Sequence, residues 1–150
     1  MKNIILATLL VFSLGVSAQK SEVITDSSRT KKELFNKSLL WIEKTWGSNS
    51  DKVTDFRDED AGIIRVVGGL KAVPKSQEGF DVKGTTVTEL TISVEKGRVK
   101  LDFQHTTFKW DAGTLWNFGD DNGGTQKAKW KTDVRNEIEG MISGYRSFLK

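Results

Sequence analysis

The sequence predicts an α+β protein with two layers, in which two helices cover one face of an antiparallel sheet. Three observations indicate this fold. Two segments, one near the N-terminus and one at the C-terminus, repeat apolar residues at the spacing of a helix. Between them, apolar and polar residues alternate, as in strands with one buried and one wet face. A short strand before the first helix completes the expected order β-α-β-β-β-β-α.

The first helix is expected from Thr30 to Trp46, after the short strand at residues 22–25. Thr30 and Glu33 have the spacing of a capping box, in which each side chain accepts a hydrogen bond from the backbone N–H of the other residue. Gly47 follows as the residue that ends the helix. The inward face repeats at helical spacing and consists of Phe35, Leu39, Ile42 and Trp46.

Residues 53–58 and 63–67 are expected to form two strands around an acidic turn. The turn raises the question of a metal-binding or catalytic cluster, because it gathers Asp55, Asp58, Glu59 and Asp60. Acids and Gly62 are also ordinary turn residues, since they tolerate the required φ and ψ angles and bond nearby amides. We therefore interpret the stretch as a turn between two strands. The following Gly68 and Gly69 are expected to allow a bulge or a close contact.

The clearest hairpin spans residues 85–110, with Lys96 and Gly97 in a two-residue turn. This turn fixes the register of the two strands, and near the turn each inward apolar residue then faces another. The expected pairs are Val94 with Val99, Ile92 with Leu101, Leu90 with Phe103, Thr88 with His105 and Thr86 with Thr107. Beyond Thr107 the apolar phase shifts to Phe108 and Trp110, which predicts a bulge or the strand end at that point.

Residues 111–126 are expected to form a long loop that carries Trp116 and Phe118. The last helix is expected from about Thr132 to Leu149, and Trp130 would extend its apolar face if the helix began earlier. Gly140 and Gly144 flank this face. Each glycine costs about 1 kcal/mol relative to alanine in a helix, so they are expected to let a strand or a bound molecule approach closely.

Residues 1–18 are expected to be a signal peptide. Lys2 precedes an apolar run from Ile4 to Val16, and the small Ala18 precedes the expected cleavage site. The run is shorter than the ~20 apolar residues of a spanning helix, so no stable membrane anchor is expected after cleavage. Cleavage would leave 150 − 18 = 132 residues, 19–150, as one exported domain, periplasmic or extracellular.

The composition argues against several classes of function. The net charge is +3, and basic and acidic residues are interleaved, whereas a nucleic-acid-binding surface needs a segregated basic stripe. No nucleic-acid partner is therefore expected. The chain has no cysteine, which removes disulfides and cysteine chemistry.

Three stretches of the sequence together resemble a family of secreted bacterial domains of unknown function, described as having a TATA-binding-protein-like fold. They are ELFNKSLLWI at Glu33–Ile42, DEDAGIIRVVGG at Asp58–Gly69 and TELTISVEKGRVKLDF at Thr88–Phe103. The resemblance covers roughly residues 22–108, and the loop and helix at 111–150 are less covered. It implies the same two-layer fold and supplies no catalytic residues. It implies nothing about DNA, because function belongs to a site and not to a fold.

No catalytic residue, metal ligand or cofactor is expected. His105 is the only histidine and is expected to point inward, without a nucleophile or a carboxylate to orient it. The stretch from Gly119 to Gly124 begins like a calcium loop but has no bidentate glutamate at the required position, where Lys131 stands instead. Trp110 and Trp116 are expected to cap the open end of the sheet, or else to form the mouth of an apolar pocket or a protein-binding patch.

The first hypothesis for function is a non-enzymatic exported module of the cell envelope that binds a partner protein or a small apolar ligand. The expected contacts lie between the sheet and the last helix, at His105, Trp110, Trp116 and Gly144. One alternative is an envelope-acting enzyme that uses His105 with an acid from residues 55–60. A second alternative is a structural envelope component without a ligand.

Overall fold

The computed structural model describes residues 20–74, 83–111, 113, 115–120 and 122–150. The predicted signal peptide and its cleavage site after Ala18 lie outside these residues. Within them, no helix is both long enough and apolar enough to cross a membrane.

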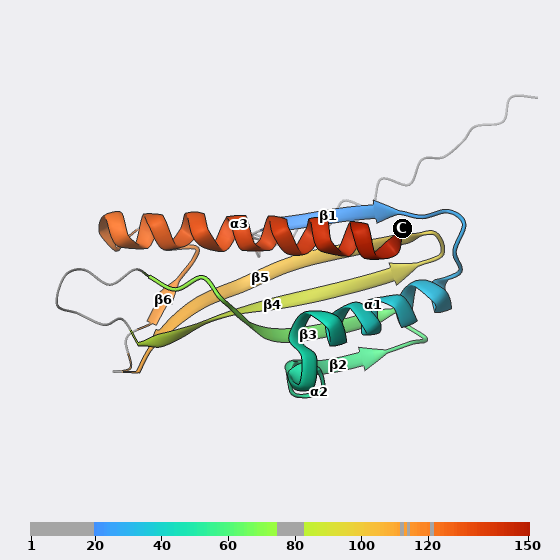
Figure 1. Ribbon diagram of the computed structural model, residues 1–150, viewed down its shortest axis with the longest axis horizontal. Helices are drawn as coiled ribbons and strands as arrows, with labels where there is room; N and C mark the ends of the chain where they lie inside the picture. Colours follow the sequence, from blue (N-terminus) through green and yellow to red (C-terminus); the bar gives the residue numbers. More distant parts are fainter. Residues whose placement is uncertain (1–19, 75–82, 112, 114, 121) are drawn as a thin grey trace, which may run out of the picture.

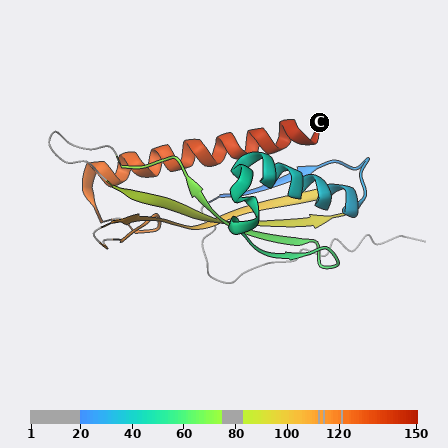
Figure 2. The same ribbon diagram turned by 60° about the horizontal axis from the view of Figure 1, so that its bottom comes forward.

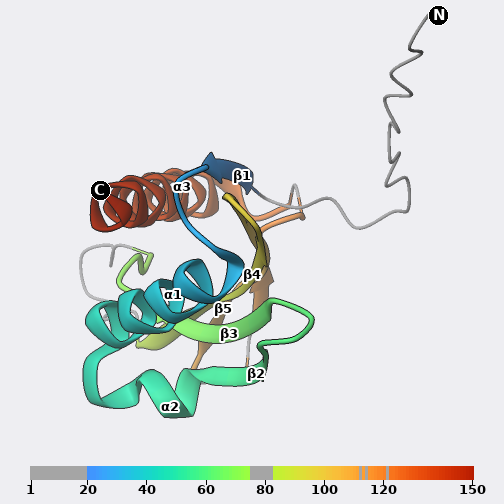
Figure 3. The same cartoon turned by 90° about the vertical axis from the view of Figure 1, so that its right-hand side faces the viewer.

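The fold is one antiparallel sheet with two helices packed on one face, which confirms the predicted α+β class. The strands lie in the order β1-β5-β4-β3-β2, and β6 pairs with the far end of β5. The helices α1 and α3 lie on the same face of this sheet (Figures 1 and 3). The strands are β1 (Lys20–Thr25), β2 (Thr54–Asp58), β3 (Ile63–Leu70), β4 (Gly84–Glu95), β5 (Arg98–Trp110) and β6 (Leu115–Asn117). The helical segments are α1 (Lys31–Trp46), η1 (Gly47–Asn49), α2 (Ser50–Val53) and α3 (Gly124–Leu149).

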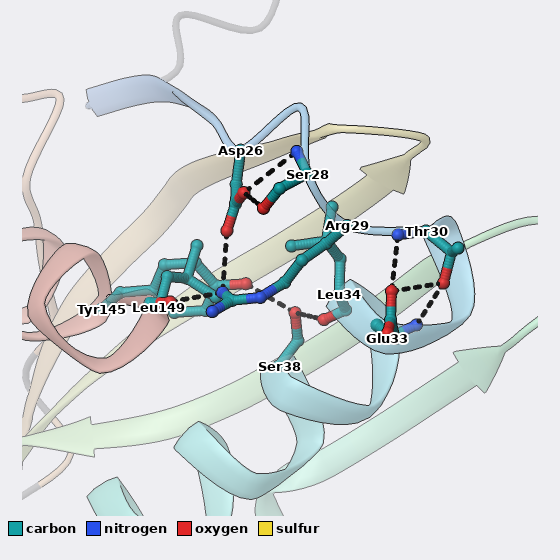
Figure 4. Close-up of polar contacts among 9 residues, drawn as sticks. All are labelled: Asp26, Ser28, Arg29, Thr30, Glu33, Leu34, Ser38, Tyr145 and Leu149. Atoms are coloured by element: carbon teal, nitrogen blue, oxygen red, sulfur yellow. Dashed lines mark hydrogen bonds and ion pairs between the residues drawn. The ribbon is translucent and has the colours of Figure 1, made fainter.

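Helix α1 begins where the capping box predicted. The backbone N–H of Glu33 donates to the Thr30 hydroxyl at 3.2 Å, and the Glu33 carboxylate accepts from the Thr30 N–H at 2.8 Å (Figure 4). Gly47 ends the helix with a φ of 57°.

The predicted inward face of α1 is correct for Phe35 and Ile42, which are buried, whereas Leu39 and Trp46 are only partly buried. Leu34, Ser38 and Trp41 are buried in addition, because α1 packs against α3 as well as the sheet.

Helix α3 begins at Gly124, earlier than the predicted Thr132. The added turns carry two buried side chains, Lys127 and Trp130, at helical spacing from Val134. Lysine is a charged residue, so the apolar pattern of the sequence did not indicate that position 127 faces inward. The result is a helix that runs along the length of β4 and β5 (Figure 2).

Strand β6 was not predicted, because residues 115–117 were assigned to a loop. In the structure, Trp116 pairs with Phe108 across the edge of β5, and the N–H of Phe118 donates to the Thr106 carbonyl at 2.9 Å. The apolar partner of Trp116 is Phe108, which lies in β5. The sequence of residues 115–117 alone therefore could not indicate this pairing.

The predicted hairpin register is correct near the turn and wrong beyond it. Leu90 faces Phe103, as expected. Glu89 then faces Gln104 while Val87 faces Thr107, so His105 and Thr106 together lie opposite the single residue Thr88. This β-bulge lies before the predicted position, and it shifts every later residue of β5 by one. Thr86 consequently faces Phe108 and not Thr107.

The acidic stretch between β2 and β3 is a turn, as interpreted. Asp58 accepts a hydrogen bond from the N–H of Ala61 at 2.8 Å, and Gly62 has a φ of 73°. The carbonyl of Gly62 accepts from the N–H of Val94 at 2.7 Å, which ties the turn to β4. Among the described residues, no group of three or more His, Cys, Asp or Glu side chains is placed to hold a metal ion.

Gly68 allows a close contact, which is one of the two uses predicted for it. A Cβ atom at this position would lie 2.6 Å from the indole ring of Trp46. The Trp46 ring packs over the edge of β3, and its N–H donates to the Gly69 carbonyl at 3.3 Å. The last turn of α1 is thereby fixed against the sheet.

Substituting Gly68→Ala is therefore expected to lower the free energy of unfolding by about 1–3 kcal/mol, the usual cost of overpacking. Urea unfolding measures the change. Gly69→Ala is the matched control, because its Cβ would meet only the Thr86 carbonyl oxygen at 3.9 Å. Equal effects of the two substitutions would contradict this account of Gly68.

Candidate functional site

The predicted contacts Trp110 and Trp116 belong to an aromatic cluster at one end of the sheet. Their ring centroids are 5.6 Å apart, and Trp116 lies 6.0 Å from the fully buried Trp130 of α3. Phe108 and Phe118 complete the cluster. Both tryptophans are half-buried and pack on the buried Phe108, as the capping interpretation expects.

One polar atom in this aromatic cluster is unusual. The indole N–H of Trp110 is buried and donates to no acceptor within the part of the chain that the structure describes. The indole N–H of Trp130, in contrast, donates to the Thr86 hydroxyl at 3.0 Å.

The prediction that His105 points inward is wrong. The bulge places His105 at a φ of 47°, with its side chain exposed, while the next residue Thr106 takes the inward position. Thr106 is buried, and its hydroxyl lies 2.7 Å from the Thr88 hydroxyl. The physical reason is hydrogen bonding. The bulge buries the hydroxyls of Thr88 and Thr106, which bond each other, and leaves the His105 imidazole in solvent.

The bulge also separates His105 from the acids of residues 55–60. Three steps between strands separate β5 from β2, and the acids lie several residues further along the sheet. At strand spacings, His105 is roughly 15 Å or more from these acids. Asp55 is in addition paired with Arg65 at 2.5 Å. The acid–base pair that the enzyme alternative requires is therefore not assembled.

In the stretch from Gly119 to Gly124, oxygen atoms of Asp120 and Asn122 contact the ammonium groups of two lysines. Lys127 is buried, with 3% of its surface exposed. Its ammonium group donates to the side-chain oxygen of Asn122 at 3.2 Å and lies 3.9 Å from the Asp120 carboxylate. The Lys131 ammonium donates to the Asp120 carbonyl at 2.6 Å. These positive charges stand beside the oxygens that a calcium ion would need.

Gly144 lies away from the aromatic cluster, at a groove between α1 and α3. Gly144 follows Trp130 by 144 − 130 = 14 positions along α3, which correspond to about 21 Å at a rise of ~1.5 Å per residue. The structure therefore brings Trp110 and Trp116 together and leaves both His105 and Gly144 elsewhere.

The α1/α3 groove has a volume of about 620 Å³ and is open to solvent along its length. Trp41, Met141 and Phe148 supply its apolar surface. Gly140 and Gly144 form part of the wall, and a Cβ atom on either would meet nothing within 4 Å. The predicted close approach of a strand to these glycines is therefore not made by the described part of the chain.

Lysines surround the α1/α3 groove. Lys44 and Lys71 line it directly. The ammonium groups of Lys37 and Lys44 lie 5.8 and 5.6 Å from the centre of the Phe148 ring, at one end of the groove. None of the three lysines forms an ion pair with any residue in the described ranges.

Glu137 is the acidic residue that lines the groove, and its carboxylate is already used. One of its oxygens accepts from the N–H of Lys71 and the other from the N–H of Ala72, both at 2.8 Å. This bidentate contact fixes the chain that leaves β3 against α3. The carboxylate keeps its negative charge, but the lining holds two lysines against this one glutamate and is therefore net positive.

Below the groove, a buried hydrogen-bond chain holds α1 and α3 together (Figure 4). The Ser38 hydroxyl donates to the Leu34 carbonyl at 2.8 Å, so the Tyr145 hydroxyl, 2.6 Å away, donates to Ser38. Burial raises the pKa of Tyr145 to about 12. Arg29 bonds the Leu149 carbonyl and pairs with Asp26 at 2.8 Å, which anchors the end of α3.

The opposite face of the sheet carries no helix within the described residues (Figure 3). Three of its basic side chains are paired with acids close by. The pairs are Arg65 with Asp55, Lys100 with Asp102 and Arg98 with Glu95, at 2.5, 2.9 and 2.5 Å. In the described strands, this face therefore mixes positive and negative charges.

Comparison with known proteins places this architecture in a family. Residues 21–109 match the family described as domain of unknown function DUF4468 with TBP-like fold. The chain belongs to this family. The matched region covers the sheet from β1 to β5 together with α1, which agrees with the resemblance seen in the sequence; the groove wall on α3 lies outside it.

Two solved bacterial structures share the fold. A DUF4468 family protein from Bacteroides ovatus aligns with a TM-score of 0.70 at 13% identity, over 86% of this chain and 84% of its own. A TBP-like protein from Parabacteroides distasonis aligns with a TM-score of 0.61 at 14% identity, over 85% of this chain and 91% of its own. At this identity the likeness shows the fold alone. The sequence matches no curated protein.

Sequence reasoning identified Gly144 but missed the residues opposite it. Trp41 is not among the residues predicted for the inward face of the first helix, and the sequence analysis does not single out Lys37, Lys44 or Lys71. The sequence does contain a signal, because residues 37, 41, 44 and 45 share one helical face and combine lysines with a tryptophan. Only the packing of α1 beside α3 shows that this face borders a groove.

Proposed function

We propose that this protein is an exported, non-enzymatic interaction module of the cell envelope, and that a partner protein binds in the α1/α3 groove. The observation that carries the proposal is the groove itself, an open and partly apolar surface lined by two lysines, Lys44 and Lys71, that form no ion pair with the described residues. The predicted signal peptide supports export. The dispersed positions of His105 and the acids give no support to an enzyme.

The two glycines of α3 strengthen the assignment of the groove. Each costs roughly 1 kcal/mol in a helix relative to alanine. Outside the backbone of α3 itself, no described atom lies within 4 Å of the position that a Cβ atom would occupy on either glycine. Packing within the described fold therefore gives no reason for glycine at these positions. Close approach of a bound partner would give one.

The shape of the groove favours a protein partner over a small ligand. A small-molecule site encloses most of its ligand's surface, and this groove is open to solvent along one side. A segment of another protein needs no such enclosure, because further contacts outside the groove can add to its affinity. The small apolar ligand that the sequence also suggested is therefore the weaker candidate.

Photo-cross-linking in cells of the source organism tests the proposal. A benzophenone amino acid at Thr45, which is exposed and lines the groove, is expected to give a specific protein adduct on a chain that begins at Gln19. The same group at Lys109, exposed on the opposite face of the sheet, is expected to give none.

The substitution Gly144→Trp supplies the control for occupancy of the groove. It fills space that is open in the structure, so the domain should stay folded while the Thr45 adduct disappears. An adduct that persists in the Gly144→Trp protein would contradict the proposal. The absence of any adduct at Thr45 would favour the structural alternative.

A further inference from the structure

We propose that the segment that occupies the α1/α3 groove is an acidic amphipathic helix of the partner protein. This inference rests on the proposed function and adds the chemistry of the partner. It follows from the charge, the backbone and the dimensions of the groove.

The charge of the groove selects an acidic segment. Lys44 and Lys71 line it and form no ion pair among the described residues. Lys37 adds a further positive charge near the Phe148 end, although it also acts on the Asp26 carboxyl. Glu137 supplies one negative charge against the two positive charges of Lys44 and Lys71, so the lining of the groove keeps a net positive charge. Carboxylates on a bound segment would supply the missing negative charge beside the apolar surface of Trp41, Met141 and Phe148.

The walls of the groove select a helix over an extended strand. Both walls are helices, whose backbone N–H and C=O groups are bonded within α1 and α3. An extended segment would find no backbone partners there, whereas a helix satisfies its own backbone groups. The groove-lining part of α3, from Glu137 to Phe148, is about 16 Å long, which accommodates roughly three helical turns.

A model peptide tests this chemistry with the purified chain of residues 19–150. The probe is a short helical peptide with leucine on one face and glutamate on the other, and its counterpart carries lysine in place of glutamate. We expect saturable binding of the glutamate peptide only. The amide chemical shifts that change should belong to the facing sides of α1 and α3.

Charge reversal on the protein is the matched test. The double variant Lys44→Glu/Lys71→Glu is expected to weaken binding of the glutamate peptide by about tenfold or more. The control variant Lys96→Glu/Lys109→Glu makes the same change of net charge at exposed positions away from the groove, and should have little effect. A circular-dichroism spectrum confirms that each variant is folded.

Equal binding of the two peptides, or shift changes on the uncovered face of the sheet, would overturn the inference. Its failure is distinguishable from failure of the proposed function. If the Thr45 adduct forms in cells and survives Lys44→Glu/Lys71→Glu, a partner occupies the groove but its acidic character is refuted. If no adduct forms at Thr45, the proposed function itself fails.

Discussion

Trp130→Ala is expected to lower the free energy of unfolding by about 3–5 kcal/mol, a large part of the stability of a domain of this size. Trp130 is fully buried, and its ring lies within 6.3 Å of Phe108, Trp116 and Phe118. Its removal would leave a cavity between α3 and the sheet. It would also remove the donor that bonds the Thr86 hydroxyl.

Urea unfolding followed by circular dichroism measures this loss. Trp116→Ala is the matched control, because the same side chain is removed from a half-buried position at the rim of the cluster. Its cost should be clearly smaller. If the two substitutions cost the same, the aromatic cluster would not be organised around Trp130.

Tyr145→Phe is expected to change how stability depends on alkaline pH. The pKa of Tyr145 is raised from 10.0 to about 12 by burial, which outweighs the hydrogen bond to Ser38. Because the folded pKa is above the unfolded one, this stabilisation is complete below about pH 10 and is lost as the pH rises toward 12. Two pKa units correspond to roughly 2–3 kcal/mol.

The measurement is urea unfolding of both proteins between pH 8 and pH 12. The unsubstituted protein should lose more stability than Tyr145→Phe across the interval from 10 to 12. Titration of the lysines affects both proteins alike, so the difference between them isolates Tyr145. At pH 8 the variant should be less stable by about 0.5–1.5 kcal/mol, the net worth of one hydrogen bond. Parallel curves throughout would show that the Tyr145 hydroxyl is not buried in solution.

Helices α1 and α3, which Tyr145 holds together, also form the groove in which we expect the partner protein to bind. Tyr145 and Ser38 fix α1 against α3 below the surface, and the groove lies above them, so the groove has rigid walls. A preformed surface of this kind binds without the cost of ordering its own side chains and backbone. This is the physical reason to expect binding at the groove and not at the exposed turn between β2 and β3.

The sequence by itself determined the elements that depend on local chemistry. The capping box of Thr30 and Glu33 set the start of α1, the Lys96–Gly97 turn set the hairpin register near it, and Gly62 marked the turn after the acidic residues. Each of these signals acts within a few residues of the chain. Alternation of apolar and polar residues was enough to predict a sheet with one covered face.

Tertiary structure alone decided where the chemistry-bearing residues meet. The bulge at His105 depends on Thr88 of the neighbouring strand, and the early start of α3 depends on space for Lys127 and Trp130 beneath it. The groove is lined by Trp41 of α1 and by Gly140 and Gly144 of α3, and no periodicity within either helix encodes that these residues meet. Contacts between distant segments fix these features, and for that reason the sequence identified Gly144 without showing which residues face it.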